Sequence, residues 1–182
     1  MDALRIRELE HSDVDALLAF ETLNRPWFES HIDPRPSSFY SPHGVQQHIE
    51  HYLKGFAEGV WHPFVIEDGE GNGERHIVGR ANLKDINTAK GLAEVGYRIA
   101  QDACGRGLAT RALRHLIEQA QRRWGLEQLV AYAYHTNAGS QRVLTRCGFV
   151  ADPVNCEPGT SDAQPPRELR FTLRLRSVES AR

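Results

Sequence analysis

Residues 93–110 read AEVGYRIAQDACGRGLAT, and they join an alternating segment to a helical one through a turn with two glycines. From position 93 to 99, apolar residues alternate with polar residues or glycine, which predicts a strand with one buried face. A helix that begins at such a turn exposes main-chain N–H groups and the positive end of its dipole. Both features attract a phosphate or pyrophosphate, so the sequence predicts an anion-binding turn at 105–107.

Two other phosphate-binding motifs do not fit this turn. A P-loop ends in Gly-Lys-Ser or Gly-Lys-Thr, whereas Gly107 is followed by Leu108 and Ala109. A Rossmann fingerprint needs a third glycine where Thr110 stands, and the strands predicted before the turn form a hairpin. The remaining alternative is a glycine-rich turn that only connects the strand to the helix.

The rest of the chain alternates between strand and helix patterns. The expected strands span 4–7, 61–67, 76–83, 93–99, 129–134 and 169–175, and the expected helices span 12–23, 41–59, 105–124 and 138–147. In the helix near the start, Ser12 is expected to be the N-cap. Prolines interrupt residues 24–40 and 152–166, which are expected to be irregular. This order indicates an α/β fold, a mixed sheet with helices on its faces.

Length and charge narrow the class of protein. A chain of 182 residues fits a single domain over 1–182, with the polar residues 177–182 expected to be a frayed tail. A net charge of −2 argues against general nucleic-acid binding, which requires a basic footprint. No apolar run approaches the roughly 20 residues that span a bilayer, so no membrane segment is expected.

Cysteine usage and the start of the chain bear on its compartment. The first seven residues alternate charge with aliphatic side chains, unlike the apolar segment of a signal peptide. Cys104, Cys147 and Cys156 have no CxxC spacing and read as free thiols. These features are typical of a cytoplasmic protein.

Two longer stretches carry a family resemblance. GLAEVGYRIAQDACGRGLATRAL at 91–113, followed by AYHTNAGSQRVLTRCGFV at 133–150, resembles the GNAT superfamily of acetyltransferases, and within it the RimJ/RimL-like protein N-acetyltransferases. LRIRELEHSDVDALLAF at 4–20 and HIVGRANLKDI at 76–86 also look like that group. The resemblance implies a GNAT-like mixed, mostly antiparallel sheet with helices on both faces. It also implies an enzyme that moves acetyl from acetyl-CoA to a primary amine without a covalent enzyme intermediate.

The same resemblance implies the residues that bind acetyl-CoA. The turn and the helix start are expected to cradle its pyrophosphate through Gly105, Arg106, Gly107, Leu108, Ala109 and Thr110. Asp102 stands where the family usually has Gln or Arg, which weakens phosphate affinity unless Arg106 compensates. Main-chain groups of Arg98, Ile99 and Ala100 are expected to pair with the pantetheine amides, while the Arg98 side chain itself reads as solvated.

Three further residues are implied near the reacting atoms. Asn137 is a good helix cap by itself, and the resemblance adds a role as a CoA ligand. Ser140 is expected near the thioester sulfur as a proton donor to the leaving thiolate, the alternative being an ordinary first-turn residue. Glu94 is expected to be a general base acting through water, the alternative being an exposed strand charge. Arg142 and Arg146 read as solvated.

The acceptor is the least determined part. An α-amine with a pKa near 8 is partly neutral at pH 7, whereas a lysine near 10.4 costs roughly 3 kcal/mol more to deprotonate. A protein or peptide α-amine is therefore the leading acceptor. A small amine such as an amino acid, polyamine or aminoglycoside is the alternative, and a non-catalytic acyl-CoA-binding module, mildly favoured by Asp102, is the rival. Both a monomer and a homodimer fit the sequence.

Two other clusters have competing interpretations. His43, His48 and His51 lie on or near one predicted helix, but no carboxylate or cysteine pattern accompanies them, so a solvated face is favoured over a metal site and no metal is expected. Aromatic side chains in 24–40 either line a substrate groove or anchor the segment to the core: Trp27, Phe28, Phe39 and Tyr40. Residues 24–40 and 152–166 are expected to contact the acceptor.

Overall fold

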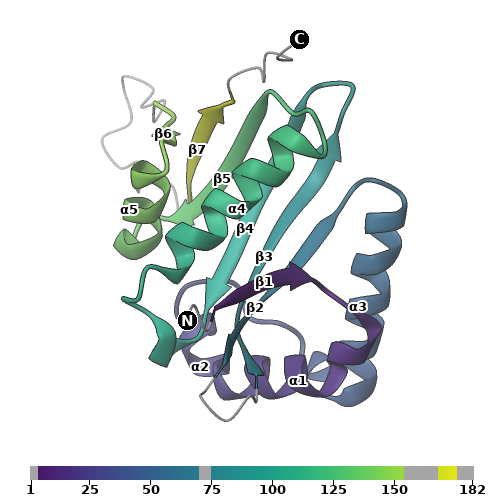
Figure 1. The fold of residues 1–182 in the computed structure, drawn as a ribbon. Helices are drawn as coiled ribbons and strands as arrows, with labels where there is room; N and C mark the ends of the chain where they lie inside the picture. Colours follow the sequence, from purple (N-terminus) through teal and green to yellow (C-terminus); the bar gives the residue numbers. More distant parts are fainter. Residues whose placement is uncertain (1–3, 70–74, 154–167, 176–182) are drawn as a thin grey trace.

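The computed structural model describes residues 4–69, 75–153 and 168–175. The strands in these ranges form a seven-stranded sheet (Figure 1). The strands are β1 (Arg5–Glu8), β2 (His62–Gly69), β3 (Arg75–Asn87), β4 (Leu92–Ile99), β5 (Gln128–Tyr134), β6 (Val150–Ala151) and β7 (Glu168–Arg174). The α-helices are α1 (Val14–Leu23), α2 (Arg25–Glu29), α3 (Pro42–Ala57), α4 (Leu108–Arg122) and α5 (Ala138–Arg146). Three short 3-10 turns are η1 (His11–Asp13), η2 (Ser37–Phe39) and η3 (Gln101–Ala103).

The sheet is mixed and mostly antiparallel, as the sequence predicts. Its strand order is β1-β2-β3-β4-β5-β7-β6, and β4–β5 is the parallel pair in the described part of the chain. Apart from its first two residues, the segment expected to be irregular at 152–166 lies outside the described residues. The expected tail at 177–182 and Cys156 also lie outside them.

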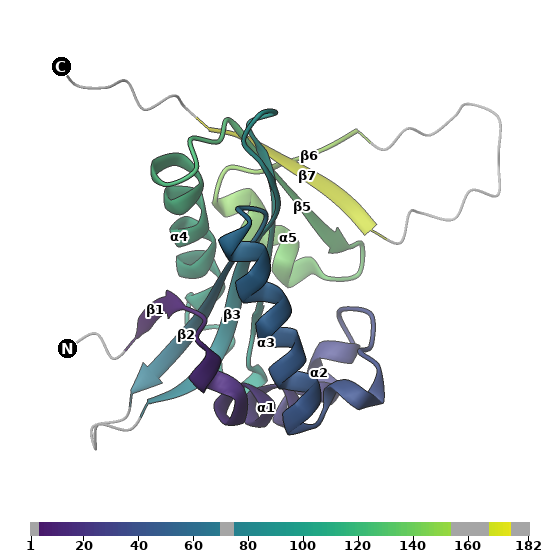
Figure 2. The same ribbon diagram turned by 90° about the vertical axis from the view of Figure 1, so that its right-hand side faces the viewer.

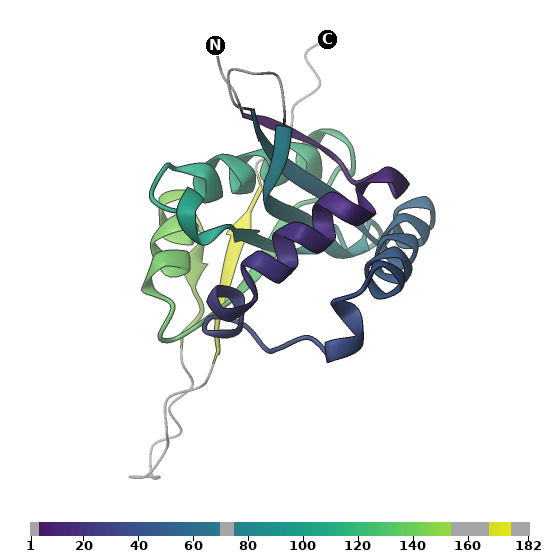
Figure 3. The ribbon, with the colours of Figure 1, turned by 90° about the horizontal axis from the view of Figure 1, so that it is seen from below.

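Helices cover both faces of the sheet (Figures 2 and 3). The strand register shows which residues point to which face. Phe64, Ala81 and Tyr97 lie opposite one another across β2, β3 and β4. The centroid of the Phe64 ring lies 4.7 Å from that of the His115 ring of α4. Arg80, one residue earlier on β3, points to the other face, where it pairs with Glu21 of α1. The Tyr97 side of β4 therefore faces α4, and the next residue faces α1 and α3.

Apolar stripes explain how the helices pack. The predicted face of α4 is buried at Leu108, Ala112, Leu116 and Ala120. Helix α3 begins as predicted at Ser41-Pro42, where the Ser41 hydroxyl accepts a hydrogen bond from the Gly44 N–H at 3.0 Å. These caps and stripes agree with the tertiary arrangement, which is why both helices could be predicted from sequence.

Two local expectations were wrong. Ser12 is not the N-cap, because it lies inside η1 and α1 begins after Asp13. The Asp13 carboxylate instead accepts from the Glu10 N–H and pairs with Arg7. Residues 24–40 are also more regular than expected, since they contain α2 and η2. Elements this short complete too few turns to show a helical period.

Candidate active site

The two central strands separate halfway along their length. Strands β4 and β5 pair in parallel only over 92–95 and 128–131, although β4 continues to Ile99 and β5 to Tyr134. The antiparallel pair β3–β4 stays closed, with Arg80 opposite Arg98 and Gly79 opposite Ile99. An opening therefore forms inside the sheet, between the carboxyl-terminal halves of two neighbouring strands.

Main-chain groups of β4 face this opening. The Ala100 N–H donates to the Val78 carbonyl of β3 at 2.8 Å. Hydrogen bonds alternate between the two sides of a strand, so Arg98 also faces β3 while Tyr97 and Ile99 face the opening. The Ile99 carbonyl accepts from the Trp27 indole N–H at 3.3 Å. Of the main-chain groups expected to pair with pantetheine, those of Arg98 and Ala100 thus face β3. The main-chain groups on the open edge of β4 are the N–H and the carbonyl of Tyr97 and the N–H of Ile99.

A cavity of about 620 Å³ fills the opening and extends to the start of α4. It brings together these residues singled out from the sequence: Arg98, Ile99, Gly105, Gly107, Leu108, Ala109, Thr110, Asn137 and Ser140. It is also lined by residues that were not singled out as site residues: Trp27, Phe28, His31, Ile32, Tyr97, Thr136, Arg142, Val143 and Arg146. Glu94, Ala100 and Arg106 are not among its lining residues.

The glycine turn before α4 has the geometry of an anion site. Gly105 and Gly107 have φ values of +79° and +77°, which L side chains rarely adopt. No heavy atom lies within 4 Å of a Cβ built at either glycine, so a ligand can approach the backbone closely. Gly107 is the N-cap of α4 without a side-chain cap bond. The first N–H groups of a 15-residue helix therefore point toward the cavity with the positive end of its dipole.

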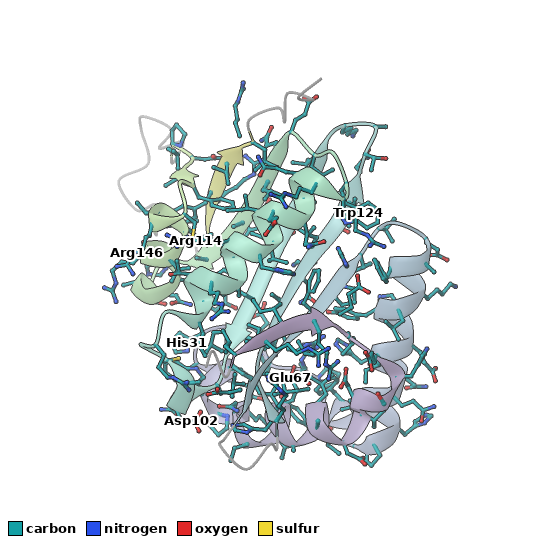
Figure 4. The ribbon with its side chains drawn as sticks, in the orientation of Figure 1. His31, Glu67, Asp102, Arg114, Trp124 and Arg146 are labelled. Atoms are coloured by element: carbon teal, nitrogen blue, oxygen red, sulfur yellow. The ribbon has the colours of Figure 1, made fainter. Side chains whose placement is uncertain are left out.

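The two charged residues of this turn point elsewhere. Arg106 pairs with Asp68 at 2.7 Å. Asp102, labelled in Figure 4, is exposed in η3 and is not among the residues that line the cavity. The departure of Asp102 from the family pattern therefore puts no carboxylate into the cavity. The positive charge of Arg106 is already neutralised by its ion pair with Asp68.

A hydroxyl pair lies where α5 meets β4. The Tyr97 hydroxyl lies 2.9 Å from the Ser140 hydroxyl and 3.4 Å from the Ser140 carbonyl. Asn137 caps α5, because its side-chain oxygen accepts from the Ser140 N–H at 3.0 Å. Burial raises the pKa of Tyr97 to about 12, and the bond to Ser140 only partly opposes this shift. Tyr97 therefore keeps its proton throughout the neutral range and can donate it.

Arg98 is not solvated, contrary to the sequence-based expectation. Its guanidinium lies 2.8 Å from a carboxylate oxygen of Glu21, a fully buried residue of α1. Glu21 also pairs with Arg80 at 3.0 Å. Burial alone would raise the pKa of Glu21, but the charges of Arg98, Arg80 and Arg35 lower it below the ordinary value. Glu21 is therefore ionised, and it fixes Arg98 at the cavity wall.

His31, labelled in Figure 4, lies just beyond α2 and lines the cavity. Its Nδ1 lies 2.9 Å from the Trp27 carbonyl oxygen and 2.7 Å from the Ser30 hydroxyl, so a proton on Nδ1 can be donated to either oxygen. In that tautomer the Nε2 atom carries the lone pair of the ring. No sequence pattern pointed to this residue, because α2 is too short to show a helical period.

Glu94 and the histidines of α3 lie away from the reacting region. Glu94 forms an ion pair with Lys84 of β3, near the closed end of the β4–β5 pair. His48 is half-buried rather than solvated, and its Nε2 accepts from the Arg80 guanidinium at 3.0 Å. Within residues 4–69, 75–153 and 168–175, no group of three or more His, Cys, Asp and Glu side chains could hold a metal ion. No helix of the described chain has the length and apolar character needed to cross a membrane.

Known proteins resemble this chain in sequence and in fold. Residues 3–150 match a family described as the acetyltransferase (GNAT) domain. The probable N-acetyltransferase YjcK of Bacillus subtilis (strain 168) is 27% identical over 145 residues, covering 79% of this chain and 78% of that protein.

Two solved structures show the same fold. The ribosomal-protein-S5-alanine acetyltransferase from Vibrio fischeri superposes with a TM-score of 0.83 at 19% identity, covering 96% of this chain and 94% of that one. RimL, a ribosomal L7/L12 alpha-N-protein acetyltransferase in complex with coenzyme A, superposes with a TM-score of 0.81 at 18% identity, covering 96% of each chain.

Proposed function

This chain belongs to the GNAT acetyltransferase family and is an acetyl-CoA-dependent N-acetyltransferase, and we propose that it acetylates the α-amine of a protein or peptide. The observation that carries the proposal is the cavity between β4 and β5. It joins an anion-binding helix start to a half-buried hydroxyl pair and to the opposite face of the sheet. The RimL and S5-alanine acetyltransferases, which have this fold, are named for action on ribosomal proteins.

The cofactor is held by main-chain groups. The pyrophosphate of acetyl-CoA binds the N–H groups of Leu108, Ala109 and Thr110, with Gly105 and Gly107 allowing its approach. The pantetheine amides pair with the open edge of β4 at Tyr97 and Ile99. Asn137 contributes by fixing the first turn of α5 beside the thioester.

The reaction needs little covalent machinery because a thioester is already activated. The neutral amine attacks the thioester carbonyl carbon, and a main-chain N–H on the open edge of β4 stabilises the oxyanion. The C–S bond then breaks, and the thiolate takes a proton from the Tyr97–Ser140 pair, giving an amide and free CoA thiol. Holding both reactants in one cavity supplies much of the rate enhancement.

Two residues are candidates for the base that removes the amine proton. His31 lines the cavity, which favours it. Glu94 would have to act through water from its ion pair with Lys84.

A small amine is the alternative acceptor, and a non-catalytic acyl-CoA-binding module is the rival function. The binding module is less favoured by the structure than by the sequence, because Asp102, the residue that favoured it, does not line the cavity.

The test measures thiol release from acetyl-CoA with peptides and with small amines as acceptors, together with the melting temperature of the protein. Acetyl-CoA at 100 times its dissociation constant should add about 2.7 kcal/mol of stability, while NADH adds none. No thermal shift with acetyl-CoA would contradict cofactor binding, and a shift without thiol release from any amine would indicate a binding module.

A further inference from the structure

Three arginines share one carboxylate beneath the face of the sheet that carries α1 and α3. Glu21 lies 2.8 Å from Arg98, 3.0 Å from Arg80 and 3.7 Å from Arg35. Among the described residues, Glu21 is the only carboxylate within ion-pair distance of these guanidinium groups. Three positive charges against one negative charge leave an excess of two.

Burial makes this excess of positive charge unusual. The side chain of Glu21 is 0% exposed and that of Arg80 is 2% exposed, so water cannot screen the charges effectively. Each guanidinium lies over an aromatic ring: Arg98 over Phe28 at 5.0 Å, Arg35 over Phe39 at 4.4 Å and Arg80 over Tyr52 at 5.2 Å. Rings attract the cations through their electron-rich faces, but they carry no charge that balances the excess.

Hydrogen-bonding groups of the cluster are also left without partners. The Nε and Nη2 atoms of Arg80 and the Nε atom of Arg35 are buried and have no hydrogen-bond partner. His48 accepts one bond from Arg80, but burial and the neighbouring arginines lower its pKa, so it stays neutral and supplies no negative charge. Burial also lowers the pKa of Arg98 to about 10, which still leaves it charged at neutral pH.

Arg98 connects this cluster to the active-site cavity. It is the arginine of the three that lines the cavity, and its side chain is 21% exposed. It follows Tyr97 on β4, so it reaches the cavity from the face opposite the hydroxyl pair. An acceptor whose amine approaches the thioester from the α1–α3 face must therefore pass Arg98 and Phe28.

We propose that the acceptor carries a carboxylate close to its amine and that Arg98 binds this carboxylate, while Glu21 acts as a positioning residue. The inference rests on the proposed function, because it assigns the substrate class of the same site. The carboxylate comes from an acidic side chain at the start of a peptide or from the α-carboxylate of a free amino acid. Either source supplies the negative charge that the cluster lacks, through charge-assisted bonds to the guanidinium.

The test compares acceptors that differ only in charge. Thiol release is measured with peptides that begin with Asp or Asn and are otherwise identical, and with asparagine and its α-amide. We expect the charged acceptor to have a kcat/KM about 10 to 100 times that of its neutral partner, the usual range for a hydrogen bond to a charged group. A preference within the peptide pair identifies the side-chain carboxylate as the source, and a preference confined to the amino-acid pair identifies the α-carboxylate.

Variants of Arg98 test whether this residue causes the preference for the charged acceptor. Arg98→Gln should bring the Asp-to-Asn ratio close to 1 with an unchanged KM for acetyl-CoA, and Arg98→Lys should restore part of it. Arg25→Gln is the control, since Arg25 pairs with Glu29 on the surface of α2 and does not line the cavity. It should keep the wild-type ratio.

Equal rates for charged and neutral acceptors in the wild type would overturn the inference while leaving acetyl transfer intact, and this result does not depend on any variant folding. A ratio that survives Arg98→Gln would overturn the role of Arg98. If acetyl-CoA raises the melting temperature but no amine releases thiol, the proposed function itself fails and this inference fails with it.

Discussion

Tyr97 and Arg98 are consecutive residues of β4 whose side chains leave the strand on opposite faces of the sheet, yet both line one cavity. Tyr97 reaches Ser140 of α5, and Arg98 reaches Glu21 of α1. Such an arrangement requires an opening within the sheet, which the early end of the β4–β5 pairing supplies. In the proposed reaction, this one dipeptide contacts the thioester through Tyr97 and the acceptor through Arg98.

The Tyr97 hydroxyl can be tested as the proton donor. Tyr97→Phe removes the donor and leaves the ring, so we expect kcat to fall by about tenfold. This loss is smaller than is usual for acid catalysis because a thiolate leaves readily. The KM for acetyl-CoA should change little. Since the pKa of Tyr97 is about 12, the wild-type rate should show no loss from Tyr97 ionisation below about pH 11. Tyr132→Phe, on an exposed part of β5, is the control. An unchanged kcat in Tyr97→Phe would leave Ser140 alone as the donor.

The base can be assigned by comparing His31→Gln with Glu94→Gln. Removing the base should slow the reaction most at low pH, where the amine is protonated, and least near pH 9, where an α-amine is already neutral. We expect this pattern for His31→Gln, because His31 lines the cavity and Glu94 is paired with Lys84. The pH–rate profile of each variant is measured by thiol release. A shifted profile in Glu94→Gln together with an unchanged one in His31→Gln would reverse the assignment.

Glycine substitutions separate backbone strain from cofactor binding. Gly107 and Gly125 both have positive φ, +77° and +60°, and a Cβ at either meets no heavy atom within 4 Å. Gly107→Ala and Gly125→Ala should therefore each lose roughly 1–2 kcal/mol of unfolding free energy from the left-handed backbone alone. Only Gly107→Ala should also lose most of the acetyl-CoA thermal shift, since Gly107 lines the cavity and Gly125 does not. Equal shifts in both variants would remove the turn from cofactor binding.

Glu21 should be a large contributor to stability. Glu21→Gln leaves the guanidinium groups of Arg80 and Arg98 buried without a counter-ion, and we expect a loss of about 3–5 kcal/mol in urea unfolding. Glu118→Gln, which removes an exposed partner of Arg122, is the control and should barely change the urea midpoint. A similar midpoint for both variants would contradict the role of Glu21.

The same residue sets a pH dependence of stability. Its folded pKa lies below the unfolded value near 4.3, so its contribution is complete above about pH 4.3. As the pH falls through the lower folded pKa, Glu21 takes up a proton and this stability is lost. Acid unfolding of the wild type should therefore be steeper below about pH 4 than that of Glu21→Gln, followed by circular dichroism. Parallel acid transitions in the two proteins would show that Glu21 titrates without a shift.

The parts of the site that could be predicted are those encoded by neighbouring residues. The turn at 105–107, its helix and the Asn137 cap each occupy a few consecutive positions, so their residue types and spacing carry the signal. Alternation along β4 also predicted that neighbouring side chains point to opposite faces. It could not predict what covers each face, because Arg98 and its partner Glu21 are separated by 77 residues. The ion pair therefore became visible only with the packing of α1 on the sheet.

Residues 24–40 show the second kind of limit. Prolines and the absence of a period predicted an irregular segment, but α2 and the turn after it bring Trp27 and His31 to the cavity. Phe28 both packs in the core and lines the cavity, so the two interpretations of these aromatics are not exclusive. The interaction that fixes Trp27 is a bond to the Ile99 carbonyl, again between residues far apart in sequence.

The separation of β4 from β5 has a consequence for the order of events. In the proposed reaction the thioester lies on the α4–α5 side of this opening, and the amine approaches from the α1–α3 side. Neither substrate then blocks the other, so initial-rate plots should intersect, as they do when both are bound before either product leaves. A single molecule that links the CoA sulfur to the acceptor through a two-carbon bridge should occupy both sides of the opening at once and bind more tightly than either half.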